Sequence, residues 1–291
     1  MNNPVLITGG AGSVGKRLVD RFLKAGQSVR IFDLPIMDFT DLENLDGVEI
    51  VQGDITNPSD VNAAVTNISG AVHLAAILPP NSEKNRDITF AVNVGGTKNL
   101  IDAIHQNQPN AKLVFTSSIS TYGDTSSESP PILVDHPQNA IDVYAESKMV
   151  SESDLKSSSI PWVILRIASI AVPAFMEPPE PWPFTSDQRV EMIHRDDVVD
   201  ALFASVLEEQ SSNKIFNIAG GKSWQKHGSD YVNDFFDFMG APVESAIFRD
   251  TPGWNDWYNT KESQEILGYQ NRSYAHFANE MREIVRKMME E

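Results

Sequence analysis

Short apolar runs alternate with amphipathic segments along most of the chain. The apolar runs lie at residues 5–7, 28–32, 48–52, 71–74, 112–115, 162–166 and 214–218. Segments with helical periodicity separate them, among them residues 16–25, 59–65 and 84–106. Strands that are apolar throughout are typical of a parallel sheet covered by helices on both faces. The pattern therefore predicts an α/β fold with a doubly wound parallel sheet.

The last third of the chain departs from this alternation. Residues 175–184 are rich in proline, and helical periodicity dominates at residues 231–239, 260–267 and 274–289. No Ser/Gly linker or internal repeat divides the chain. We therefore predict a main domain of residues 1–168 plus 194–219, and a small C-terminal lobe of residues 169–193 plus 220–291.

Composition excludes several classes of protein. The 291 residues carry a net charge of -17, which argues against nucleic-acid and anionic-membrane partners because both need a basic face. The chain has no cysteine, so disulfides, thiolate metal sites and cysteine nucleophiles are excluded, and we predict no metal site. No apolar run reaches about 18 residues, and no basic segment precedes the first strand. We expect a soluble, cytoplasmic protein.

A glycine-rich turn follows the first apolar run. Residues 8–15 read Thr-Gly-Gly-Ala-Gly-Ser-Val-Gly and open a helix. A strand, a glycine turn and a helix N-terminus form a phosphate-binding unit, in which Gly9 makes the turn, Gly12 lets the pyrophosphate approach and Gly15 lets helix and strand pack closely. The next strand ends at Asp33, whose carboxylate would accept hydrogen bonds from both ribose hydroxyls and repel a 2′-phosphate. The sequence thus predicts NAD rather than NADP.

Other strand ends carry weaker signals. Asp54 would either accept a hydrogen bond from the adenine amino group or form the turn before residue 58. Small residues at Ala75 and Ala76 leave room for the nicotinamide end of the cofactor, whereas His73 is expected to pack within its strand. Asn93 would either bond to a bulge in its helix or hold a water near the active site.

A possible catalytic group follows the fifth strand. That strand ends in Ser117 and Ser118, and a helix beginning near Ile141 carries Tyr144 and Lys148. Residues four apart share one face of a helix, so the lysine ammonium and a nicotinamide ring would together favour the phenolate of Tyr144. Tyr144 would then take the hydroxyl proton as hydride leaves carbon, while Ser118 holds the reacting oxygen.

Taken together, these motifs make the chain resemble the extended short-chain dehydrogenases/reductases, also called NAD-dependent epimerases/dehydratases. The resemblance extends to Asn93-Val94-Gly95-Gly96-Thr97, Leu165-Arg166 and residues 194–198. It implies a Rossmann-type NAD domain, a substrate-binding lobe, a homodimer formed through the helices of Asn93 and Tyr144, and catalysis by Ser118, Tyr144 and Lys148. It also implies cofactor contacts from Gly9, Gly12, Ser13, Val14, Gly15, Asp33, Leu34, Asp54, Ile55, Leu74, Ala75, Ala76, Asn93, Tyr144 and Lys148.

The substrate site is where the chain departs from that family. Dehydratases of the family carry two acids where this chain has Ile119 and Ser120, so we expect no dehydration. Nucleotide-sugar enzymes carry Asn where this chain has Ser169, which puts a nucleoside diphosphate in doubt. Arg189 would either be an ordinary surface residue, the default for arginine, or bind an anionic substrate in a fork. The expected substrate contacts are Ser118, Ile119, Ser120, Tyr144, Ser169 and Arg189.

Segments beyond the catalytic group have two interpretations each. Residues 175–184 would form a lid over the substrate or pack on the lobe. The aromatic residues Trp254, Trp257 and Tyr258 would line the substrate pocket or, more in keeping with their spacing, fill the core of the lobe. At residues 194–197, we expect Asp196 to cap a helix and His194 to be structural.

Three functions remain open at this stage. The first is an epimerase that oxidises a secondary alcohol of a sugar or nucleotide sugar and returns the hydride to the other face. The second is a dehydrogenase or reductase of a sugar, lactone or other small alcohol, with net cofactor turnover. The third is a non-catalytic NAD-binding protein, against which Ser118, Tyr144 and Lys148 argue.

Overall fold

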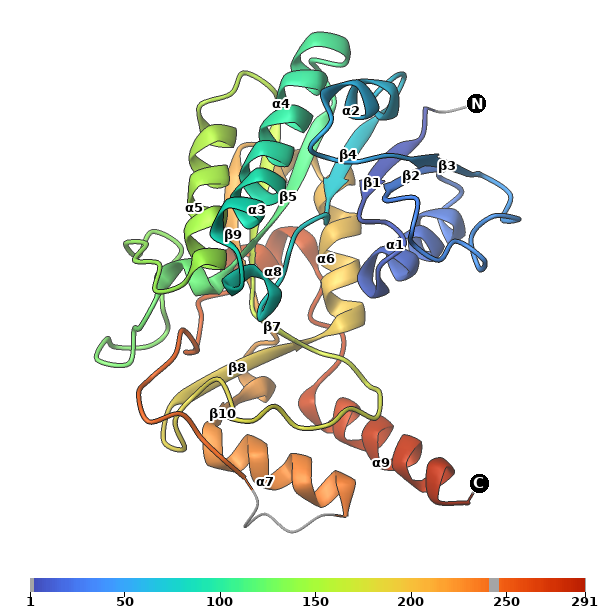
Figure 1. The fold of residues 1–291 in the computed structure, drawn as a ribbon. Coiled ribbons are helices and arrows are strands. Elements are labelled where there is room, and N and C mark those ends of the chain that lie inside the picture. Colours follow the sequence, from blue (N-terminus) through green and yellow to red (C-terminus); the bar gives the residue numbers. More distant parts are fainter. Residues whose placement is uncertain (1–2, 241–245, 291) are drawn as a thin grey trace.

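A seven-stranded parallel sheet forms the centre of the main domain (Figure 1). The computed structural model describes residues 3–240 and 246–290, so the expected domain limits at residues 1 and 291 lie outside the described residues. The sheet order is β3-β2-β1-β4-β5-β6-β9. Its strands are β1 (Val5–Thr8), β2 (Val29–Asp33), β3 (Val48–Gln52), β4 (Gly70–His73), β5 (Lys112–Ser118), β6 (Trp162–Ile167) and β9 (Lys214–Ile218). The predicted doubly wound sheet is confirmed.

Helices cover both faces of this sheet. One apolar core holds residues of α1 (Ser13–Lys24), α6 (Arg195–Leu207) and α8 (Lys261–Leu267). The other face packs against α2 (Pro58–Ala64), α4 (Gly96–Asn107) and α5 (Val143–Lys156). Strands buried on both faces explain why their sequences are apolar throughout.

The direction of winding reverses between β1 and β4. Both strands pair with each other in parallel, but β2 and β3 extend the sheet one way and β5, β6 and β9 the other. Ligands of doubly wound proteins bind at the carboxyl ends of the strands at such a reversal. The glycine turn after β1 and the loop after β4 both lie at this point.

The segment expected as one helix over residues 84–106 is interrupted. It comprises a 3-10 turn (Asn81–Glu83), α3 (Arg86–Phe90), a π-helical turn (Ala91–Gly95) and then α4. The wider turn frees the backbone carbonyl of Asn93, which accepts hydrogen bonds from the hydroxyls of Thr97 (2.5 Å) and Ser151 (3.1 Å). A bulge is therefore present, as one interpretation of Asn93 required, but its backbone rather than its side chain satisfies it.

The lobe has its own small sheet and its own core. The sheet order is β10-β8-β7, with β7 (Ser169–Ala171), β8 (Arg189–His194) and β10 (Gln225–His227), and α7 (Gly228–Met239) and α9 (Tyr274–Glu290) pack beside it (Figure 1). Trp182 and Phe184 are buried in this core against Tyr231. The aromatic residues at 182 and 184 therefore pack on the lobe, and they are not free to act as a lid.

One stretch assigned to the lobe packs on the main domain instead. Tyr258, Leu267 and Tyr269 belong to the core beneath α1 and α6. Tyr258 stacks on Tyr122 of the main domain, with ring centroids 6.3 Å apart. The expectation that the aromatic residues of 254–258 fill the lobe was wrong for Tyr258, because its ring packs in the core that holds α1 and α6.

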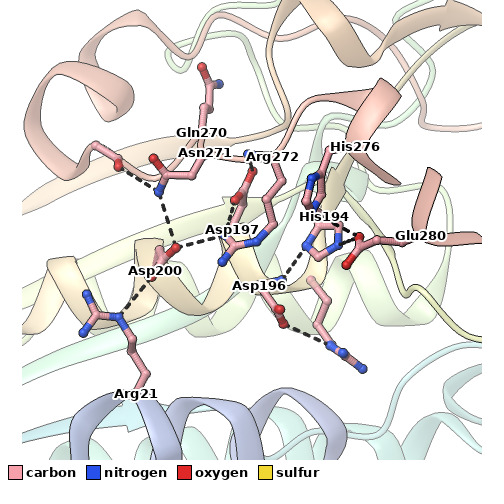
Figure 2. A network of polar contacts seen from close by, with 12 residues as sticks. Arg21, His194, Asp196, Asp197, Asp200, Gln270, Asn271, Arg272, His276 and Glu280 are labelled. Atoms are coloured by element: carbon pink, nitrogen blue, oxygen red, sulfur yellow. Dashed lines mark hydrogen bonds and ion pairs between the residues drawn. The ribbon is translucent and has the colours of Figure 1, made fainter. Parts of the chain in front are cut away.

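A polar network joins α1, α6 and the C-terminal segment (Figure 2). Arg272 pairs with Asp197 (2.6 Å) and with Asp200 (3.1 Å), and Asp200 also pairs with Arg21 of α1 (3.1 Å). The expected helix cap at Asp196 was wrong. His194 caps α6 by accepting the backbone N–H of Asp196 on Nδ1, and its other ring nitrogen meets Glu280 (2.9 Å).

Candidate active site

Two adjoining cavities lie along the carboxyl edge of the sheet. Gly9, Gly12, Leu74 and Leu78 line both of them. The first, of about 280 Å³, reaches from the glycine turn to Ser118, Tyr144 and the lobe, and the second, of about 410 Å³, reaches from the same turn to Asp33 and Asp54. We call them the catalytic cavity and the nucleotide cavity. Together they form one elongated groove.

The glycine turn is shaped so that side chains are excluded. A Cβ on Gly9, which has φ +72°, would lie 2.7 Å from the backbone N of Ala75. A Cβ on Gly15 would lie 2.6 Å from the backbone oxygens of Gly9 and Gly10. Close approach of α1 to the turn thus requires glycine at 15, and the N-terminus of α1 opens onto the groove. This cradle fits a pyrophosphate.

Asp33 and Asp54 stand at the far end of the nucleotide cavity. The carboxylate of Asp33 accepts the backbone N–H groups of Ala11 (3.0 Å) and Leu34 (2.9 Å), which fix it at the strand end. Asp54 accepts the N–H and the hydroxyl of Thr56 (both 2.8 Å), so it forms the turn that one interpretation expected. Both acids still line the cavity. Their carboxylate oxygens can accept hydrogen bonds from ribose hydroxyls and from an amino group.

Ser118 and Tyr144 line the same wall of the catalytic cavity. The hydroxyl of Ser118 accepts the backbone N–H of Ser120 (3.1 Å), which leaves its own proton for another acceptor. Lys148 is 2% exposed and lies behind Tyr144, with Nζ 5.6 Å from the centre of the phenol ring. Its ammonium donates to the backbone oxygen of Thr116 (2.8 Å). The structure brings the three predicted catalytic residues together.

The start of the catalytic helix α5 is held by two carboxylates. Asp142 caps it by accepting the N–H of Ala145 (2.7 Å). Glu83, from the loop after β4, accepts the N–H groups of Val143 (3.0 Å) and Tyr144 (3.1 Å). No sequence motif points to Glu83, because its partner Val143 lies 60 residues away.

The pKa of Tyr144 is raised in this structure, whereas the sequence predicts that it is lowered. Burial raises the pKa of the phenol, and the charge of Asp142 raises it further. Burial also lowers the pKa of Lys148 to about 7, which weakens the neighbouring positive charge. The effect of burial on the pKa of Tyr144 therefore exceeds that of the Lys148 charge. A phenolate at Tyr144 would require a further positive charge, such as that of a nicotinamide ring.

His73 is a structural residue, as expected. It is 1% exposed, and its ring nitrogens meet the hydroxyls of Thr8 (2.6 Å) and Thr97 (3.0 Å). Burial lowers the pKa of His73 to about 3, so the imidazole is neutral.

Most predicted cofactor residues line the groove, and two act from behind it. Ser13, Val14, Gly15 and Tyr144 line the catalytic cavity, and Leu34, Ile55, Ala75 and Ala76 line the nucleotide cavity. Lys148 and Asn93 line neither. The Asn93 amide binds both the N–H (2.7 Å) and the carbonyl (3.1 Å) of Ile77, and also the hydroxyl of Ser147 (3.0 Å). It therefore fixes the loop after β4 against α5.

The predicted substrate contacts divide in two. Ser118, Tyr144 and Ser169 line the catalytic cavity, whereas Ile119 and Ser120 are buried behind it, at 0% and 1% exposure. Trp254 lines the catalytic cavity. The sequence favours a place in the core of the lobe for this residue over a place in the substrate pocket. Residues that line the cavity but were not predicted as site residues are Leu78, Thr116, Ser117, Ile167, Ala168, Ile170, Val198 and Leu202. Most of them are apolar, and no motif distinguishes these from core residues.

Arg189 does not reach the cavity. Its guanidinium binds the buried carboxylate of Asp256 through Nε (2.6 Å) and Nη2 (2.9 Å), and Nη2 also meets the backbone oxygen of Glu128 (2.9 Å). The expected fork on a substrate anion is replaced by an internal ion pair. No Lys or Arg is among the described residues that line the catalytic cavity.

The fold and the site define a short-chain dehydrogenase/reductase: a doubly wound sheet with a glycine turn at its reversal and a Ser, Tyr and Lys group beside it. Residues 6–160 match the 3-beta hydroxysteroid dehydrogenase/isomerase family, and the chain belongs to that family. The predicted resemblance is confirmed. None of the helices in the described part of the chain is long and apolar enough to cross a membrane.

Curated relatives include dehydrogenases and an epimerase. The chain is 31% identical over 185 residues to D-erythronate dehydrogenase of Cupriavidus necator, covering 58% of this chain and 55% of that protein. It is 37% identical over 155 residues to a Mycobacterium tuberculosis 3 beta-hydroxysteroid dehydrogenase/Delta 5-->4-isomerase (51% and 40% covered). It is 36% identical over 128 residues to CDP-paratose 2-epimerase of Salmonella typhi (41% and 38%). The chain thus matches about half the length of these relatives or less.

Solved structures share the whole fold. A short-chain dehydrogenase/reductase superfamily protein from Agrobacterium tumefaciens, with bound NAD, superposes with a TM-score of 0.78 at 21% identity, covering 98% of both chains. The Bordetella bronchiseptica enzyme WbmG, in complex with NAD and UDP, gives 0.81 at 19% identity, covering 99% of this chain and 96% of that one. At these identities the likeness establishes the fold.

Proposed function

We propose that this chain is an NAD-dependent oxidoreductase that interconverts a secondary alcohol and a ketone on a small substrate, with net turnover of the cofactor. One observation carries the proposal: Ser118 and Tyr144 line the same cavity as the glycine turn. Asp33 at the far end supports NAD over NADP, because a 2′-phosphate would meet its negative charge. The substrate would therefore lie between the catalytic residues and the lobe.

Ser118, Tyr144 and Lys148 would carry the proton chemistry, with the positive charge of bound NAD favouring the phenolate of Tyr144. Bound NAD would supply the hydride acceptor. The Ser118 hydroxyl would donate a hydrogen bond to the substrate oxygen and so hold that oxygen beside Tyr144. Tyr144 would exchange a proton with that oxygen, acting as base in oxidation and as acid in reduction. Lys148, one turn further on α5, would supply positive charge behind the phenol.

Net turnover is favoured over epimerisation of a nucleotide sugar by the charges around the site. A nucleoside diphosphate needs cations, yet Arg189 is engaged with Asp256 and no described cation lines the catalytic cavity. Leu78, Ile170 and Trp254 make the outer wall apolar. Dehydration is not proposed, because Ile119 and Ser120 supply no acid and are buried.

The deciding experiment uses the purified chain with added NAD. A panel of sugars, sugar acids, lactones and sterols would be tested for reduced nicotinamide by absorbance. Net reduction of NAD supports the dehydrogenase, whereas conversion of a sugar or nucleotide sugar by tightly bound NAD without net absorbance change supports the epimerase that the sequence suggested first.

A paired substitution tests the catalytic assignment. Tyr144→Phe removes the acid/base group and should lower turnover by about 10²- to 10⁴-fold. Tyr231→Phe makes the same chemical change in the core of the lobe and should leave turnover near wild type. If Tyr144→Phe retained wild-type turnover, a non-catalytic protein would be the better explanation.

The homodimer stays a prediction. It would place the helices of Asn93 and Tyr144 against their copies in a partner subunit. The molar mass in solution, measured by light scattering, would test it.

A further inference from the structure

One fully buried carboxylate lies beneath the catalytic pair and has no part in the chemistry proposed above. Glu152 is 0% exposed on α5, four residues after Lys148 and eight after Tyr144. Residues at this spacing follow one another along a single face of a helix. The phenol, the ammonium and the carboxylate therefore form a row that runs inward from the cavity.

Glu152 accepts hydrogen bonds on both of its carboxylate oxygens. Oε1 accepts the hydroxyl of Ser117 (2.6 Å) and Nε of Arg166 (3.0 Å). Oε2 accepts Nη2 of Arg166 (2.7 Å) and the amide of Gln138 (3.0 Å). Ser117 directly precedes Ser118 on β5, and Arg166 is the penultimate residue of β6, the strand that leads to Ser169. One carboxylate thus ties the ends of two strands to the helix of Tyr144.

Apart from the aromatic rings of Phe115 and Tyr144, whose centres lie 4.8 Å and 5.6 Å from Nζ, Lys148 has one hydrogen-bonding partner for its charge in the described part of the chain. Within the described residues its one hydrogen bond is to the backbone oxygen of Thr116, and the side chain is buried. A buried ammonium with a single neutral acceptor favours the uncharged amine unless an opposite charge is near. Burial lowers the pKa of Lys148, and Glu152 opposes that fall.

We propose that Glu152 is a positioning residue for catalysis, which fixes the ends of β5 and β6 against α5 and keeps the Lys148 ammonium charged behind Tyr144. Other charged or titratable groups face this row. His73 approaches Lys148 from β4 and is neutral, and Arg166 and Tyr122 approach Glu152 from β6 and from the turn after β5. The catalytic consequence rests on the proposed function, but the charge of Lys148 can be measured without it.

The direct test is titration of Lys148 by nuclear magnetic resonance, using the full chain labelled with ¹³C at lysine Cε. The Lys148→Met variant assigns the signal. Glu152→Gln should lower the midpoint of Lys148 by roughly one pH unit, because the negative charge is lost. From a midpoint near 7, this shift would reduce the protonated fraction at pH 7 about fivefold, and turnover at that pH should fall with it.

Three variants separate electrostatics from damage to the fold. Glu152→Gln combined with Arg166→Gln avoids a buried unpaired guanidinium and should still lower the midpoint. Glu152→Asp keeps the charge, so the midpoint should stay near wild type even if the strand contacts weaken. Glu191→Gln alters another carboxylate that is 0% exposed, in the lobe, and should leave the midpoint unchanged.

The outcomes are distinguishable. An unchanged Lys148 midpoint in both Glu152→Gln variants would overturn the inference, as would a fall in turnover that is equal at every pH. Failure of the proposed function would appear differently, as a Tyr144→Phe variant with wild-type turnover. That result would leave the measured Lys148 midpoints as they stand.

Discussion

The two cavities of the groove are built in different ways. The nucleotide cavity is lined by the glycine turn, by small residues such as Ala75 and Ala76, and by the strand-end acids Asp33 and Asp54, together with apolar side chains. The outer part of the catalytic cavity is made by side chains from separate segments, including Leu78, Ile170 and Trp254. Backbone requirements constrain the residue type at each position, whereas an apolar wall accepts many residues. The cofactor half is therefore visible in a sequence, and the substrate half is not.

The largest effect is expected at the glycine turn. Gly15→Ala places a Cβ 2.6 Å from two backbone oxygens, so α1 must move away from the turn. NAD affinity should fall about 10- to 100-fold, as measured by calorimetric titration. Gly95→Ala is the control, because its Cβ would meet only an ordinary contact at 3.8 Å. Equal NAD affinity in both variants would refute a backbone-built cofactor site.

Arg189 provides the next test, now of stability. Arg189→Ala leaves the fully buried Asp256 without its partner and should lower the free energy of unfolding by about 2 kcal/mol, discounted for the partial exposure of the guanidinium. The Michaelis constant for substrate should not change. Arg286→Ala, which breaks exposed pairs on α9, should leave denaturant unfolding unaltered. A large rise in the Michaelis constant of the Arg189→Ala variant would indicate that Arg189 contacts the substrate after all.

Trp254 tests the outer wall of the catalytic cavity. Trp254→Ala should raise the Michaelis constant for substrate about tenfold through lost apolar contact, while the constant for NAD stays unchanged. Trp257→Ala is the matched control, because Trp257 lies against His227 and does not line the catalytic cavity. A similar rise in both variants would indicate general damage to the segment.

The smallest effect concerns pH and His73, the last residue of β4. The folded-state pKa of His73 is about 3, below the ordinary value of 6.5, so its contribution to stability is present above pH 6.5 and is lost as pH falls toward 3. Between pH 6.5 and 5.5 the loss should be about 1 kcal/mol. His73→Asn should flatten this slope in denaturant unfolding, and the exposed His105→Gln should not. An unchanged slope in His73→Asn would show that another group titrates.

Much of the main domain could be predicted because local sequence and tertiary role agree there. The strands are apolar, the turn residues are glycines, and Tyr144 and Lys148 meet through helical spacing alone. The failures share a different cause. Arg189 finds Asp256, Glu83 finds Tyr144, and Asn93 finds Ile77 across distances in sequence that no local pattern encodes.

The same reason explains why Leu267, in a segment expected to belong to the lobe, packs on the main domain. Helix α8 has an ordinary amphipathic pattern, which says that it must bury one face but not against which partner. Its Leu267 lies in the core shared with α1 and α6. This choice depends on tertiary contacts of residues before the helix, such as Tyr258 with Tyr122.

The pairing of Arg272 with Asp197 sets a condition on the order of assembly. Asp197 has a fully buried side chain on α6, and its partner arrives 75 residues later in the chain. During synthesis, α6 would emerge with that carboxylate uncompensated, and its docking beside α1 would be completed only when residue 272 follows. We expect nascent chains ending before residue 271 to be cut readily by protease within α6, and chains extended through α9 to resist. Equal resistance of the two would show that the sheet closes without its last segment.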